Sequence, residues 1–128
     1  MKKIALLFAL TAILASCNTR YEQDNDEKGN ITRKTTEKTP FKNTELEMKG
    51  TITFNDAGTE ITGISNGGYV KYISNEMALE ARPGKNGTVG ILIHEDGNEV
   101  PSQSEKGKEL LEDAIGRMQH LQEKYNQE

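Results

Sequence analysis

The spacing of apolar residues changes once along this chain, and that change constrains the fold more than any other feature. Between residues 46 and 100, apolar residues alternate with polar ones in short runs, as in a strand with one buried face. Further along they recur at steps of three and four, as on a helix with one apolar stripe: Leu110, Leu111, Ala114, Ile115, Met118, Leu121 and Tyr125. The sequence therefore predicts an α+β fold in which strands precede one helix.

Turn residues divide the first part into an antiparallel β-meander of five or six short strands over about residues 45–100. The alternating run from Leu46 to Phe54 predicts one strand, and the nearly continuous apolar run Val89–Ile93 is expected to be the most buried. Asp96-Gly97 is the strongest two-residue hairpin signal. The remaining strands are expected over residues 59–64, 69–73, 77–82 and 98–100.

The C-terminal helix is expected over about residues 103–125. Ser102 and Glu105 have the spacing of a capping box. Asp113 and Arg117 can form an ion pair four residues apart on the outer, polar face of this helix. The apolar stripe is expected to pack on one face of the sheet.

The N-terminus has the layout of a secretory signal peptide. Lys2 and Lys3 precede the apolar run of residues 4–15. A membrane-spanning helix needs about 20 apolar residues, so this run is too short for a permanent span.

The residues Leu14-Ala15-Ser16-Cys17 follow directly and resemble the lipobox of bacterial lipoproteins. This resemblance implies cleavage between Ser16 and Cys17, removal of residues 1–16, and an anchor of diacylglycerol and a further acyl chain such as palmitate on Cys17. Cys17 is the only cysteine, so no intramolecular disulfide competes for it. The alternative is a secreted protein with a chance cysteine at the cleavage site.

The charge balance bears on partners and location. The chain has a formal net charge of −4, which becomes −6 when Lys2 and Lys3 leave with the signal. An acidic chain without a basic patch is a poor nucleic-acid binder. Asn18 replaces the Asp that would favour retention in the inner membrane. We therefore expect a lipoprotein of the cell envelope in the outer membrane, facing the periplasm or the surface.

Residues 17–44 are expected to form the lipidated cysteine and a flexible polar tether, ahead of a small domain at 45–128. The tether's large apolar residues, Tyr21, Ile31 and Phe41, are not spaced to make a face. A coil of this length spans roughly 30 Å, enough to lift the domain from the lipid headgroups.

Groups that could carry catalysis are few, and no catalytic residue is assigned. His94 and Asp96 follow the apolar strand, and His120 lies on the predicted helix. Two imidazoles and a carboxylate could form an open metal site if the helix crossed near the end of that strand. The spacing does not require this, and no cofactor or metal is expected.

Candidates for partner contacts lie on strands and turns. Tyr69 and Tyr72 point to opposite faces of a strand, so one of them is expected to be exposed. Asn66 lies in the turn 65–68 and Lys85 in the turn 83–87. The sequence favours a non-enzymatic binding module for a protein or glycan. An inhibitor of an envelope or host enzyme, acting through one of these turns, is the alternative, and a small metal-dependent hydrolase around His94 is a second.

Residues 50–73 carry a pattern of glycines and apolar residues, including Gly50-x-Ile52-x-Phe54 and Gly67-Gly68-Tyr69. This pattern resembles a recurring strand–turn–strand unit in a family of small exported β-rich bacterial domains without assigned activity. The resemblance implies the fold of this hairpin and no mechanism.

Overall fold

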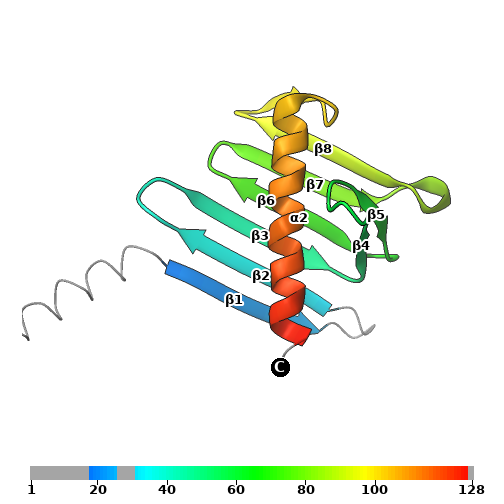
Figure 1. Ribbon diagram of the computed structural model, residues 1–128, viewed down its shortest axis with the longest axis horizontal. Coiled ribbons are helices and arrows are strands. Elements are labelled where there is room, and N and C mark those ends of the chain that lie inside the picture. Colours follow the sequence, from blue (N-terminus) through cyan, green and yellow to red (C-terminus); the bar gives the residue numbers. More distant parts are fainter. Residues whose placement is uncertain (1–17, 26–30, 127–128) are drawn as a thin grey trace, which may run out of the picture.

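The computed structural model describes residues 18–25 and 31–126. They form nine strands, a short 3-10 helix and one long α-helix (Figure 1). The elements are β1 (Asn18–Asn25), β2 (Ile31–Lys38), β3 (Asn43–Lys49), β4 (Ile52–Phe54), β5 (Ile61–Ile64), β6 (Tyr69–Ser74), β7 (Met77–Pro83), η1 (Lys85–Gly87), β8 (Val89–Glu95), β9 (Asn98–Val100) and α2 (Glu105–Asn126).

Seven strands form one antiparallel sheet in the order β1-β2-β3-β6-β7-β8-β9, and β4 pairs with β5 in a separate hairpin. The α+β prediction, an antiparallel sheet with one C-terminal helix on a face, is confirmed. Alternation is clearest in β3, where Thr44, Leu46 and Met48 are buried and the residues between them are partly exposed. This is the pattern of a sheet with one covered and one solvated face.

Helix α2 covers the buried face and crosses the strands from β8 to β1 (Figure 1). The predicted stripe is confirmed where side chains are described, since each member is at most 6% exposed. The largest fully buried side chains of the sheet, Tyr72, Leu46, Leu79 and Ile93, belong to the same core. None of the described helices is long and apolar enough to cross a membrane.

The start of α2 differs from the predicted capping box. The Ser104 hydroxyl, two residues after the predicted cap, accepts a hydrogen bond from the Gly107 amide at 3.1 Å. A Cβ on Gly107 would come within 2.3 Å of the Pro101 carbonyl oxygen. The chain therefore turns tightly against the first helical turn, and a glycine there permits that approach.

The strand predicted from Leu46 to Phe54 is broken at Gly50. This residue has a φ of +80°, and a Cβ there would lie 2.4 Å from the Ser65 hydroxyl oxygen. The chain leaves the large sheet at this point and forms the β4–β5 hairpin. Ile52 and Ile61 are buried in the common core from this hairpin.

The largest difference from the prediction lies in the segment that was expected to be a flexible tether. Residues 18–25 and 31–38 form β1 and β2, and β3 begins at Asn43, so most of the segment 18–44 belongs to the sheet. Its scattered apolar residues gave no amphipathic pattern because β1 and β2 contact the core through few side chains. Tyr21 is the β1 residue that packs against it.

The expectation that Val89–Ile93 is the most buried strand is also wrong. In β8 only Ile93 is fully buried, whereas Leu92 is 44% exposed. The run is continuous because apolar residues also stand on the solvent-exposed face of the sheet, as Leu92 does. The Asp96-Gly97 hairpin is confirmed, with φ of +51° and +83° at its two residues, as a type I′ turn requires.

Candidate interaction surface

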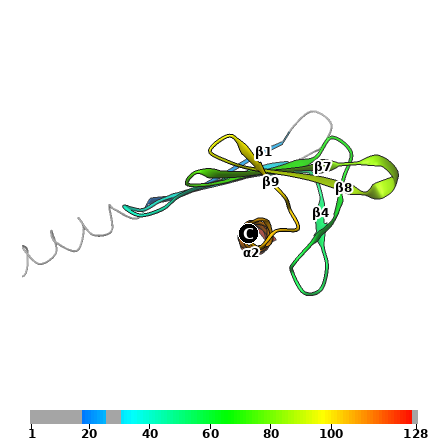
Figure 2. The ribbon, with the colours of Figure 1, turned by 90° about the horizontal axis from the view of Figure 1, so that it is seen from above.

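The sheet has one covered and one open face. Figure 2 shows α2 and the β4–β5 hairpin on the same side of the sheet. Within residues 18–25 and 31–126, no helix packs on the opposite side. We call this second side the open face, and side chains from seven neighbouring strands stand next to one another on it.

Charges on the open face alternate in sign across five neighbouring strands. The strand registers place one residue of each strand in a single row, from β1 to β7: Glu22, Lys34, Glu47, Lys71 and Glu80. Opposite charges on adjacent strands attract each other. Lys34 also forms an ion pair with Glu45 at 2.9 Å, and this hydrogen bond raises the lysine pKa.

Tyr69, the first residue of β6, lies on the same face, beside the charged row. Its hydroxyl donates a hydrogen bond to Glu47, and the cationic groups of Lys71 and Arg82 lie 5.2 and 5.6 Å from the ring centroid. Partial burial, followed by the bond to Glu47, raises the pKa of Tyr69 to about 12. The Tyr69 hydroxyl keeps its proton at physiological pH, and its ring lies between the cationic groups of Lys71 and Arg82 and the Glu47 carboxylate.

Apolar side chains lie beside the charges. Ile73 and Leu92 are each 44% exposed on the open face. A shallow depression of about 500 Å³ borders Ile73 near the β2–β3 turn, and Phe41 stands at its rim. Apolar and aromatic side chains form the core of protein-binding surfaces, and polar groups surround them at the rim.

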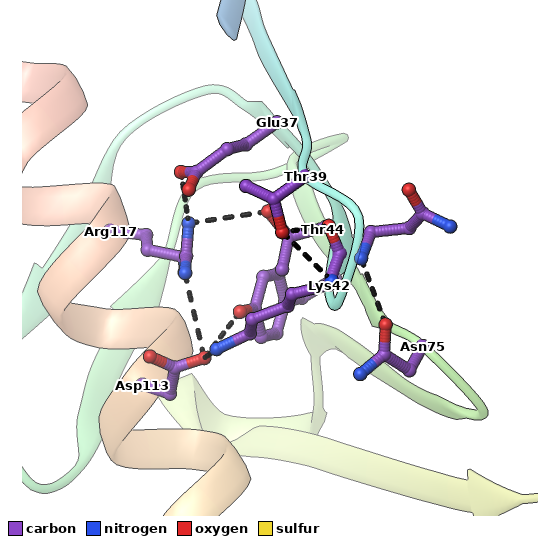
Figure 3. A network of polar contacts seen from close by, with 9 residues as sticks. Glu37, Thr39, Lys42, Thr44, Asn75, Asp113 and Arg117 are labelled. Atoms are coloured by element: carbon purple, nitrogen blue, oxygen red, sulfur yellow. Dashed lines mark hydrogen bonds and ion pairs between the residues drawn. The ribbon is translucent and has the colours of Figure 1, made fainter. Parts of the chain in front are cut away.

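The covered side holds a network of polar contacts between α2 and the sheet (Figure 3). Arg117 Nη1 donates to Glu37 Oε2 at 3.1 Å and to Thr44 Oγ1 at 3.3 Å. Arg117 Nε lies 3.5 Å from Asp113 Oδ2, and the Tyr72 hydroxyl donates to the same carboxylate oxygen. One guanidinium thus joins α2 to β2 and β3.

Sequence reasoning found only part of this network. The Asp113–Arg117 pair is confirmed, but its position on an outer face is wrong, because the Arg117 side chain is only 23% exposed. The sequence signal for the contact across the sheet is the charge of Glu37, which is opposite to that of Arg117. Glu37 lies in the segment interpreted as a tether. Since Arg117 is already held by two carboxylates and a hydroxyl, the network serves to hold the helix to the sheet.

The two histidines are not brought together. His94 lies on the open face of β8, opposite Ala78 and Glu99, whereas His120 lies on α2 beside β1 at the other edge of the sheet. Asp96 is exposed in the β8–β9 turn. Among the described residues, no group of three or more His, Cys, Asp or Glu side chains could hold a metal ion.

The predicted partner-binding residues differ in their exposure to solvent. Tyr72 is fully buried and hydrogen-bonded to Asp113, so the prediction that it contacts a partner is wrong. Tyr69 is partly exposed. Asn66 is exposed in a turn that the Gly68 amide closes on the Ser65 carbonyl. Lys85 is exposed in the turn between β7 and β8, where the Thr88 amide donates to the Lys85 carbonyl in the same way.

The candidate lipidation and cleavage residues, Cys17 and Ser16, lie outside the described residues, as does the whole predicted signal peptide at 1–16. No family model, curated protein or solved structure significantly matches this chain. The arguments for its function therefore come from its own residues and their arrangement.

The Tyr72–Asp113 hydrogen bond predicts a dependence of stability on alkaline pH. Burial, and then the bond to Asp113, raises the pKa of Tyr72 above its ordinary value of 10.0. The folded protein keeps this proton where the unfolded chain releases it, so the bond's contribution to stability is complete below pH 10 and declines above it.

Tyr72→Phe should lower the free energy of unfolding by about 1–2 kcal/mol at neutral pH, because a hydrogen bond to a carboxylate is lost. The difference from the wild type should narrow above about pH 10, as measured by urea unfolding. Tyr69→Phe is the matched control and should have a smaller effect, since Tyr69 is less buried. A Tyr72→Phe difference that grows with pH would contradict this assignment.

Proposed function

We propose that this protein is a lipid-anchored component of the bacterial cell envelope whose small domain binds a partner without catalysing a reaction. The observation that supports the anchor is the order of features at the N-terminus. Two lysines, an apolar run and Leu14-Ala15-Ser16-Cys17 follow one another, and Cys17 is the sole cysteine. Several acyl chains on one residue bind a membrane far more firmly than a single chain.

The open face supports the proposal of a binding module. It places Tyr69, Ile73 and Leu92 among charges that are ordered by their cross-strand neighbours. A surface whose side chains are already held in place loses less conformational entropy when a partner binds. A protein is the partner class that best suits such a surface, because alternating charges set the register and apolar groups supply contact area.

The anchor is tested by the intact mass of protein isolated from membranes. The wild type should begin at Cys17 and carry the mass of a diacylglycerol group and a further acyl chain. Cys17→Ser should remove that mass and move the protein from the membrane fraction to the soluble fraction. Thr19→Ser, two residues away, is the matched control and should leave the anchor in place. A wild-type chain without acyl groups would refute the anchor.

The binding surface is tested with a photo-crosslinking amino acid in intact cells. We place it at Leu92 on the open face and, as the control, at Glu109 on the exposed side of α2. Position 92 should give a discrete crosslinked product that weakens in a Lys71→Gln background, whereas position 109 should give none. Equal crosslinking from both positions, or none from position 92, would contradict the assignment of the open face.

A further inference from the structure

The start of β1 lies beside the β2–β3 turn at one end of the sheet. Asn18 pairs with Lys38 in register, and Lys38 pairs with Asn43, so the turn at residues 39–42 begins directly beside Asn18. Figure 1 shows the beginning of β1 and the turns β2–β3 and β6–β7 at the same end of the sheet. Asn18, the first residue of β1, therefore lies at this end, and one peptide bond joins it to the proposed lipidation residue.

The same turn carries the most exposed large apolar side chain of the described residues. Phe41 is 92% exposed, about twice the exposure of Ile73 or Leu92. A phenylalanine left in water forgoes the free energy of burying its ring. Its position at the tip of a turn next to the proposed anchor is therefore informative.

The turn holds Phe41 outward. The Thr39 hydroxyl oxygen accepts hydrogen bonds from the amides of Phe41 at 3.3 Å and Lys42 at 2.9 Å. The Thr39 amide donates to the Lys42 carbonyl at 2.8 Å, and Pro40 restricts its own φ. These contacts fix the backbone on both sides of the phenylalanine.

Lysines flank this aromatic residue. Lys38 is exposed at the end of β2, whereas Lys42 is directed toward α2, with its Nζ 3.8 Å from Asp113 Oδ2. An aromatic ring that enters the acyl boundary, with an exposed lysine such as Lys38 reaching the headgroups, is a common arrangement in interfacial membrane contacts.

We propose that the β2–β3 turn contacts the lipid surface, with Phe41 inserted beside the acyl chains of Cys17. This inference rests on the proposed lipid anchor. In this arrangement the end of the sheet contacts the membrane directly, and no tether lifts the domain from the lipid headgroups. The strands then stand away from the membrane, and the turns at 65–68 and 84–88 lie at the far end.

The absence of tryptophan from the sequence provides a sharp test. Phe41→Trp places a single tryptophan at the turn, and Leu92→Trp is the matched control on the open face. Each lipidated protein, isolated from membranes, is reconstituted into phosphatidylcholine vesicles whose acyl chains carry bromine near the headgroups. Intact mass measured on the same samples establishes whether Cys17 carries its lipid.

Tryptophan at position 41 should show blue-shifted emission and strong quenching by the brominated chains, and tryptophan at position 92 should show neither. Quenching at both positions would overturn the proposal in favour of a domain that lies on the membrane by its open face. Lipidated protein without quenching at position 41 would overturn the membrane contact while leaving the anchor intact. Protein without lipid on Cys17 would refute the anchor and, with it, this inference.

Discussion

One helix has to cover the buried face of a seven-stranded sheet, and the rest of the structure depends on this constraint. With 22 residues, α2 is about 33 Å long at about 1.5 Å per residue. Seven strands about 4.8 Å apart span about 29 Å from first to last. A helix that crosses the strands therefore matches the width of this sheet. It cannot also cover the length of the strands, and the β4–β5 hairpin covers part of the remaining core beside it.

The structural features that the sequence predicts correctly are the local ones. The helix and most strand positions follow from local periodicity, because each burial pattern repeats within a few residues. The participation of β1 and β2 depends instead on distant pairing, and few of their side chains enter the core. A helix of this length is nevertheless longer than the width of the expected five or six strands, which span about 19 to 24 Å. That mismatch is a signal in the sequence that favours a wider sheet.

The candidate functional residues also divide into those placed by local patterns and those placed by distant contacts. Tyr69 and Tyr72 were correctly placed on opposite faces, since alternation in a strand is local. The contact between Arg117 and Glu37 joins residues 80 positions apart. The separation of His94 from His120 depends on which way the helix crosses the sheet. Sequence spacing alone does not determine either arrangement.

The proposed lipid anchor has a consequence for how the domain would be presented. If Cys17 is lipidated, no spacer separates the anchor from the sheet, because β1 begins at the next residue. The open face would then stand away from the bilayer along with the strands, accessible to partners from the side. The charge row and Tyr69 would lie on this lateral surface.

Amide hydrogen exchange of the full chain tests the central claim, that the segment following the proposed anchor is part of the sheet. Strand β2 is the informative element, since it pairs with both β1 and β3. Its amides at residues 32–38 should be protected to a degree comparable with those of β3. Exchange of these amides at the rate of an unfolded peptide would contradict the account and restore a tether between the lipid and the domain.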